Sequence, residues 1–434
     1  MGPDLLVIII VAVAVGVLVG SFTGLVPGIH VNTAATVLVA AYPALAASLS
    51  GIVDAEHMPV LVACCVFSAS TVHSFVDFVP SVFIGAPDPD EALSVLPGHR
   101  LLAEGRGMRA VRAAAVGSVV GALTAVLLAL PLQWLMLHGG MTLLDRVTLS
   151  VLLLALIIIV LSSRRKILAL VMIAVSGFIG LAVNEMGIPS TGLAGEGTLL
   201  FPMLTGMFGL PPLLERGART RAPRQRDDGE DPVGPVPGLK GVVTGLLAGW
   251  FPGITSTVGA TMASAFGRDD SPESFIAMTA SIGTVTSVFS VVALAVSGSG
   301  RSGTTQAVKE IIGNALDGFC SEAFVLILFS IAAASAVGYV VTIAAGKGMM
   351  HLFDAIPGDL LNDSVLVLIT ALVFVFTGPW GLVVLAVCAA VGMIPPALGV
   401  SRVTMAAALL VPTLLSQLGL TEQICAVLGW PLRF

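Results

Sequence analysis

Long apolar runs, separated by short polar stretches, recur along the whole chain. A transmembrane helix needs about 20 mostly apolar residues to cross the hydrocarbon core of a bilayer. Uninterrupted runs predict spans at 4–19, 113–137, 147–163, 167–183, 275–296, 323–345, 364–392 and 403–419. Runs interrupted by Gly or Pro predict weaker segments at 22–49, 58–76, 198–213 and 239–266. The pattern predicts an all-α polytopic membrane protein with about ten to twelve membrane segments, not all of them complete crossings.

Composition and charge divide this membrane protein into two halves. The chain is 56% hydrophobic and only 11% charged, whereas soluble domains carry about 25% charged residues. Residues 215–238 are charged and rich in Pro and Gly, which predicts a flexible linker. Basic clusters at 100–112, at 164–166 and in the linker are expected on the cytoplasmic side. We therefore expect a first membrane repeat at 1–214, a cytoplasmic linker at 215–238, and a second repeat with C-terminal helices at 239–434.

One motif occurs in both halves, as GSFTGLVPGIHVN at 20–32 and GLLAGWFPGITST at 245–257. Pro removes a backbone donor and Gly permits a sharp change of direction. In lipid, irregular backbone survives only where it lines a cavity inside the protein. The motifs therefore predict two broken or re-entrant helices, at Pro27 and Gly28 and again at Pro252 and Gly253. Paired broken helices in two repeats, which we expect to be inverted, are typical of a transporter binding site.

Small and polar residues flank each predicted break. Glycines four apart, Gly20 with Gly24 and Gly245 with Gly249, predict the close approach of a neighbouring helix. The polar residues that follow suit the N-terminus of a resumed helix, where free N–H groups favour an anion; they are His30, Asn32, Thr33, Thr255, Ser256 and Thr257. The alternative is that the motifs are kinks that serve packing alone.

Each half has a second polar stretch downstream of its motif. Residues 297–310 read SGSGRSGTTQAVKE, in which successive Gly and Ser residues predict an anion-binding nest and Arg301 adds a positive charge. The substrate-binding candidates here are Ser299, Gly300, Arg301, Ser302 and Thr304, and the alternative is a flexible surface loop. In the first half, His73 and Asp77 are four apart and would share a helix face. An ionisable pair at membrane depth is a candidate coupling site for Na⁺ or H⁺, with a structural hydrogen-bonded pair as the alternative.

No motif of an enzyme or an ATP-driven pump is present. The chain lacks G-x-S-x-G, H-E-x-x-H, C-x-x-C and Walker sequences, and its five cysteines have no metal-ligand spacing. We therefore expect neither enzymatic activity nor a metal, a cofactor or a nucleic-acid partner. The expected ligand is an anionic small molecule or a lipid phosphate.

Four segments together resemble the large membrane subunit of tripartite tricarboxylate transporters. They are the paired Pro-Gly motifs, IGAPDPDEALSVLPGHRLLAEGRGMRAVRAAAVGS at 84–118, SGSGRSGTTQ at 297–306, and VGMIPPALGVSRVTMAAALLVPTLL at 391–415. The chain departs from the family pattern at Ile29, His30, Asn32 and Arg301, because small residues typically follow Pro-Gly in the family and an Arg is not typical of the second turn.

The resemblance implies secondary active transport of a carboxylate in the plasma membrane, driven by an ion gradient. It also implies a small membrane subunit and an extracytoplasmic binding protein as partners. Stand-alone prokaryotic relatives, archaeal ones included, can lack both. Broken helices with small polar residues resemble polyprenyl-phosphate translocases more loosely, so translocation of a lipid carrier is the alternative function. Formation of a homo-oligomer is also compatible with the sequence.

Overall fold

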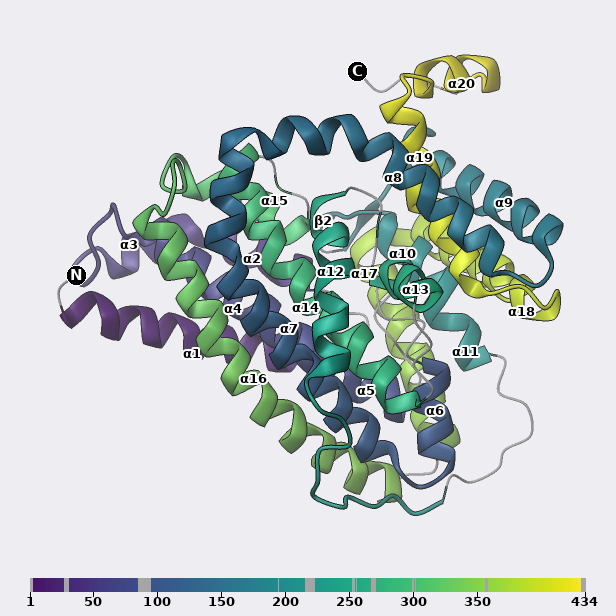
Figure 1. Ribbon diagram of the computed structural model, residues 1–434, viewed down its shortest axis with the longest axis horizontal. Helices are drawn as coiled ribbons and strands as arrows, with labels where there is room; N and C mark the ends of the chain where they lie inside the picture. Colours follow the sequence, from purple (N-terminus) through teal and green to yellow (C-terminus); the bar gives the residue numbers. More distant parts are fainter. Residues whose placement is uncertain are drawn as a thin grey trace.

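The computed structural model describes residues 3–26, 31–84, 95–193, 195–214, 223–251, 254, 256–266, 271–298, 300, 302–355 and 358–430. Most of these residues are helical (Figure 1). The described residues also form an antiparallel hairpin of β1 (Thr191–Gly192) and β2 (Gly195–Glu196). The predicted all-α polytopic fold is confirmed.

Helices follow one another with short connections through both halves. The first half contains α1 (Pro3–Leu25), α2 (Val31–Ala40), α3 (Tyr42–Leu49), α4 (Met58–Val76), α5 (Phe78–Phe83), α6 (Val95–Ala103), α7 (Gly107–Leu135), α8 (Met141–Ser162), α9 (Lys166–Glu185), α10 (Leu200–Leu204) and α11 (Leu210–Leu214). The second contains α12 (Val236–Trp250), α13 (Ser256–Phe266), α14 (Pro272–Ser297), α15 (Gly303–Ile312), α16 (Glu322–Ala355), α17 (Gly358–Gly392), α18 (Ile394–Ala397), α19 (Ala407–Gln417) and α20 (Thr421–Leu428). Two π-helical turns, Met136–Gly140 and Thr205–Gly209, and a 3₁₀ turn, Arg402–Ala406, join neighbouring helices.

Seven helical stretches in the described part of the chain are long and apolar enough to cross a membrane, or eight if one bent pair near the C-terminus is a single span. One of the seven, Gly107–Ser162, has 56 residues and is kinked at His138 and Gly139. A straight helix of that length would measure about 84 Å, so it accommodates two crossings of a core about 30 Å thick. The interrupted segments predicted at 22–49, 198–213 and 239–266 form shorter helices. The one predicted at 58–76 lies within a full span, Met58–Phe83.

Two spans form the interior of the helical bundle. In the apolar windows of the α4 and α14 spans, 83% and 78% of residues are buried, while fewer than half are buried in each of the other candidate spans. In the packing of the described helices, α4 lies against α1 and α16, and α14 lies against α7 and α12. The exposed apolar side chains of the outer helices, such as Leu127 and Ile167, are suited to contact lipid.

Glycines allow the motif-bearing helices to lie directly on these two interior helices. A Cβ on Gly20 of α1 would clash with the carbonyl oxygen of Ala69 on α4, and one on Gly24 would lie 3.0 Å from the carbonyl oxygen of His73. In the second half, a Cβ on Gly245 would lie 2.7 Å from the Cβ of Val285, and one on Gly249 would lie 2.8 Å from that of Phe289. The close approach predicted from both glycine pairs is confirmed.

We expect Gly20→Ala to destabilise the protein, because the added methyl group meets backbone rather than a movable side chain. The loss is expected to be about 1–3 kcal/mol, the range for overpacked interiors. Gly348→Ala is the matched control, since that helical glycine has nothing within 4 Å of the added Cβ. It should be neutral or stabilising by up to about 1 kcal/mol, because Ala favours helix over Gly. Thermal unfolding in detergent measures both, and equal stability of the two variants would contradict the expectation.

Candidate functional site

Both Pro-Gly motifs lie between a helix that ends and a helix that begins. In the first half α1 ends at Leu25 and α2 begins at Val31, and in the second α12 ends at Trp250 and α13 begins at Ser256. Six of the site residues predicted in the two motifs lie outside the described residues: Pro27, Gly28, His30, Pro252, Gly253 and Thr255. For Asn32, Thr33, Ser256 and Thr257 the backbone alone is described, in the first turns of α2 and α13. Their role in binding stays a prediction.

The helices that follow the two motifs pack on different neighbours. The principal contacts of α2 are with α15 and α4, while those of α13 are with α12, α14 and α8. Because α15 begins in the polar turn at 297–305, the structure brings that turn's helix beside the helix of the first motif. Two of the three predicted site segments are therefore neighbours, although they lie in opposite halves of the sequence.

The polar turn before α15 is closed by its own hydrogen bonds. Ser302 and Thr305 form a capping box, in which the Thr305 N–H donates to the Ser302 hydroxyl at 3.2 Å and the Ser302 N–H donates to the Thr305 hydroxyl at 2.9 Å. The Gln306 amide donates to the carbonyl oxygen of Gly300 at 2.8 Å. Thr304 is buried in the first turn of the helix, while Ser299 and Arg301 lie outside the described residues. In this state Ser302 stabilises the helix end, and its role as a ligand stays a prediction.

The predicted ionisable pair lies next to the end of α1. His73 is buried on α4, and its Nδ1 lies 3.0 Å from the hydroxyl oxygen of Thr23. Because the Thr23 hydroxyl donates to the carbonyl oxygen of Gly20, its oxygen is available to accept a hydrogen bond from Nδ1–H of His73. Asp77 is buried one turn further along, and its N–H donates to the carbonyl oxygen of His73 at 3.0 Å. The pair thus lies beside the C-terminal end of α1, next to the first Pro-Gly motif in the sequence.

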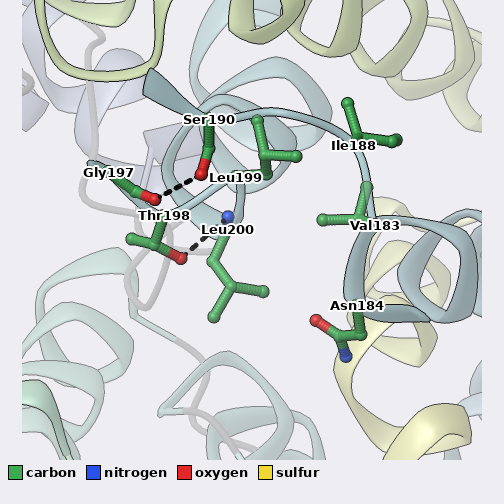
Figure 2. Close-up of a pocket in the computed structure, with 8 residues that line it drawn as sticks. All are labelled: Val183, Asn184, Ile188, Ser190, Gly197, Thr198, Leu199 and Leu200. Atoms are coloured by element: carbon green, nitrogen blue, oxygen red, sulfur yellow. Dashed lines mark hydrogen bonds between the residues drawn. The ribbon is translucent and has the colours of Figure 1, made fainter. Parts of the chain in front are cut away.

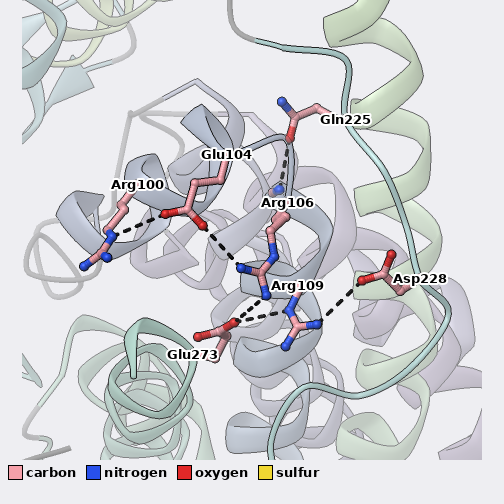
Figure 3. Close-up of polar contacts among 8 residues, drawn as sticks. Arg100, Glu104, Arg106, Arg109, Gln225, Asp228 and Glu273 are labelled. Carbon is pink, nitrogen blue, oxygen red and sulfur yellow. Dashed lines mark hydrogen bonds and ion pairs between the residues drawn. The ribbon is translucent and has the colours of Figure 1, made fainter. Parts of the chain in front are cut away.

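A network of charged side chains joins α7 to α14 beside the predicted cytoplasmic cluster at 100–112 (Figure 3). Glu273, buried in the first turn of α14, accepts from Nε of Arg109 at 3.2 Å and lies 3.6 Å from Nη2 of Arg106. Arg109 also lies 3.6 Å from a carboxylate oxygen of Asp228. These contacts connect the first half of the chain to the second.

The strongest contact of this region joins α7 to the segment before α12. The Arg112 guanidinium donates two hydrogen bonds to the Asp227 carboxylate, Nε to Oδ1 at 2.8 Å and Nη2 to Oδ2 at 3.0 Å. The Arg112 guanidinium beside it lowers the pKa of Asp227 from 3.8 to about 2. Asp231 accepts from the Tyr339 hydroxyl of α16 at 2.7 Å and lies 3.5 Å from Arg112. Acidic residues of the segment thus bind α7 and α16 together.

The described part of the linker is therefore docked and not free, which corrects the expectation of a flexible segment. Residues 223–235 run along the lower edge of the bundle in Figure 1. Gln225 is buried there: it accepts from the N–H of Gly107 at 3.0 Å and donates to the carbonyl oxygens of Leu102 and Pro223. The composition of the segment predicted a flexible linker and gave its charges no partners. The missed signal is complementary charge, because Arg106, Arg109 and Arg112 recur every third residue and DDGED follows at 227–231.

The opposite end of α7 is also tied to the second half. The buried Gln133 donates to the carbonyl oxygen of Gly318 at 3.1 Å and accepts from the N–H of Cys320 at 3.1 Å. Arg112 and Gln133 are separated by 21 residues of helix, a distance of about 32 Å that matches the thickness of a bilayer core. The two polar clamps are thus spaced to lie at opposite membrane faces.

A small pocket of about 190 Å³ lies between the end of α9 and the hairpin (Figure 2). Two of its polar side chains are bonded locally: the Ser190 hydroxyl donates to the carbonyl oxygen of Gly197 at 2.7 Å, and the Thr198 hydroxyl accepts from the N–H of Leu200 at 3.3 Å. The described lining contains no charged side chain. The pocket therefore offers no counter-charge for an anion and does not fit the transport site.

Comparison with known proteins shows to which family the chain belongs. A family model described as "Tripartite tricarboxylate transporter TctA family" matches residues 10–407, which is nearly the whole chain. The chain belongs to this family. It is also 28% identical over 308 residues to an uncharacterized protein of Methanocaldococcus jannaschii, over 69% of this chain and 72% of the relative. No solved structure matches.

Membership of the TctA family confirms the resemblance seen in the sequence. The family is one of transporters and not of enzymes, so the chain is a multi-pass membrane subunit of a tripartite tricarboxylate transporter. A tripartite system implies association with other subunits, including a binding protein and a small membrane subunit.

We expect Asp227→Asn to destabilise the protein by about 3 kcal/mol, because it removes the carboxylate that accepts two hydrogen bonds from the buried Arg112 guanidinium. The more exposed Asp231 is then the partner that remains to Arg112 among the described residues. Since Arg112 lowers the pKa of Asp227 from 3.8 to about 2, the pair's contribution is complete above pH 4 or so and is lost as the pH falls through about 2. As the pH falls through this acid range, Asp227→Asn should therefore lose less stability than the wild type does. Asp228→Asn is the control, because its side chain is 56% exposed and such pairs contribute about 0–1 kcal/mol. Unfolding of the wild type and both variants is measured as a function of pH. Equal losses of stability in Asp227→Asn and Asp228→Asn would contradict the expectation.

Proposed function

We propose that the chain is a secondary active transporter of an anionic, carboxylate-type solute, coupled to a gradient of Na⁺ or H⁺ across the plasma membrane. The observation that carries this proposal is the matched placement of the two Pro-Gly motifs. Each follows a helix that glycines hold against one of the two most buried spans, α4 or α14. Substrate would bind between the motif residues Pro27–Thr33 and Pro252–Thr257, with the turn Ser299–Thr304 closing one side.

The order of packed helices supports an arrangement of two repeats, which we propose to be inverted. In one half α1 packs on α4 and in the other α12 packs on α14. The next long helices, α7 and α16, cross over: α7 packs on α14 and α16 packs on α4. Packing of a helix of one repeat on a helix of the other is expected where two halves enclose a common site. Transport would proceed as one part of the protein moves against the other around that site.

The partners follow from the tripartite family. We propose that an extracytoplasmic binding protein delivers the solute and that a small membrane subunit completes the complex, as the family description implies. Binding of membrane lipid and formation of a homo-oligomer are further parts of the proposal. No contact among the described residues favours a polyprenyl-phosphate translocase, so that function is kept as an outcome of the test below.

Ligand screening by thermal unfolding tests the proposed solute. Succinate, citrate and a polyprenyl phosphate are compared in detergent, each with and without Na⁺. A ligand present at 100 times its dissociation constant stabilises the folded protein by about 2.7 kcal/mol. We expect a carboxylate to stabilise the wild type and to lose this effect in Arg301→Ala. Arg100→Ala is the control, because Arg100 is exposed and pairs with Glu104 alone among the described residues. Stabilisation by the lipid phosphate alone would replace the proposed function with lipid translocation.

His73 and Asp77 are the proposed coupling residues. We expect His73→Gln and Asp77→Asn to abolish solute accumulation driven by an ion gradient in proteoliposomes while leaving solute exchange without a gradient at least partly intact, because exchange needs no net ion movement. Ser70→Ala is the control, since Ser70 is buried on the same helix and does not titrate. Gradient-driven accumulation that survives in both variants would exclude the pair from coupling.

A further inference from the structure

Trp250 ends the helix that leads into the second Pro-Gly motif. Its side chain is 2% exposed, and Phe251 and Ile254, which follow it, are buried as well. The indole N–H of Trp250 has no hydrogen-bond partner in the part of the chain that the structure describes. A buried polar donor thus lies two positions before Pro252, the residue with which the proposed substrate site begins in this half.

A buried indole N–H normally has an acceptor. The indole is a donor only, and burial without an acceptor leaves its desolvation uncompensated. Several other buried side-chain groups of this kind are hydroxyls within helices, such as those of Ser68, Ser118 and Thr342. A hydroxyl can rotate towards a carbonyl oxygen of its own helix, whereas the direction of the indole N–H is set by the ring. The Trp250 donor therefore requires a specific explanation.

The two copies of the motif differ at this position. Trp250 corresponds to Leu25 in the first copy, because both residues follow the second glycine of the motif immediately and precede its Pro by two positions. Leu25 has no polar side-chain atom, so the donor belongs to one repeat alone. Gly249, beside Trp250, fits against Phe289 of α14 with no room for a Cβ. This contact holds the end of α12 against α14.

We propose that the indole N–H of Trp250 binds the transported solute by donating a hydrogen bond to one of its carboxylate oxygens. This inference rests on the proposed function. A hydrogen bond to a carboxylate is stronger than one between neutral groups, and it satisfies the buried donor only when solute is present. A neutral donor also attracts an anion less strongly than an arginine does, which suits a site that must release its solute. A purely structural Trp250 would contact no ligand.

The test uses the four tryptophans of the chain as reporters. Indole N–H signals of ¹⁵N-labelled protein in detergent are recorded while succinate or citrate is added. The Trp250 signal is assigned by its absence in Trp250→Phe, which keeps an aromatic ring and removes the donor. Trp380→Phe is the matched control, because Trp380 is exposed on α17. Affinity for the same carboxylates is measured in parallel for all three proteins.

We expect the Trp250 signal to move downfield with saturation by a carboxylate, and Trp250→Phe to bind about tenfold more weakly, the loss of one charge-assisted hydrogen bond. Trp380→Phe should bind as the wild type does. If the wild type binds but its Trp250 signal does not move, the inference fails while the proposed function stands. Binding of neither carboxylate by the wild type would refute the proposed solute class and the inference with it. If Trp250→Phe does not fold, Phe substitution of each of the other three tryptophans assigns their indole signals, and the remaining wild-type signal is that of Trp250. Whether this signal moves when a carboxylate is added then decides the inference.

Discussion

The contact between each motif-bearing helix and an interior helix is the feature on which the rest of the structure depends. Gly20 and Gly24 bring α1 onto the backbone of α4, and Gly245 and Gly249 bring α12 onto α14. In a bilayer, lipid tails are as apolar as side chains, so helices associate through close packing and hydrogen bonds. Because the glycines lie a few residues before the ends of α1 at Leu25 and α12 at Trp250, the same contacts fix where each helix ends on its partner.

Polar contacts complete what the glycines begin. The hydrogen bond between Thr23 and His73 lies one turn from the Gly20 contact and joins α1 to α4 through side chains. At the two ends of α7, Arg112 and Gln133 bind segments of the second half. Close packing thus sets the interior of the bundle, and polar clamps near the membrane faces join the two halves of the chain.

How much of the structure the sequence predicts depends on how far apart along the chain the interacting residues lie. Hydrophobic runs are local, and they predicted the all-α membrane fold and the two helices joined at Gly139. The repeated motif predicted both glycine contacts, because spacing by four residues determines one face of a helix. The family was recognised from its motifs and confirmed. The docked linker was missed, because the composition of 215–238 describes a free chain and says nothing of what lies beside it.

The sequence by itself determined the class of fold, the family, and the positions at which two helices stop before Pro and Gly. These properties depend on residues close together in the chain. The tertiary structure alone decided that Thr23 meets His73, that Asp227 meets Arg112, and that α15 lies beside α2. The first two pairs are 50 and 115 positions apart. Their meeting depends on how long helices cross, which no one-dimensional pattern of polar and apolar residues specifies.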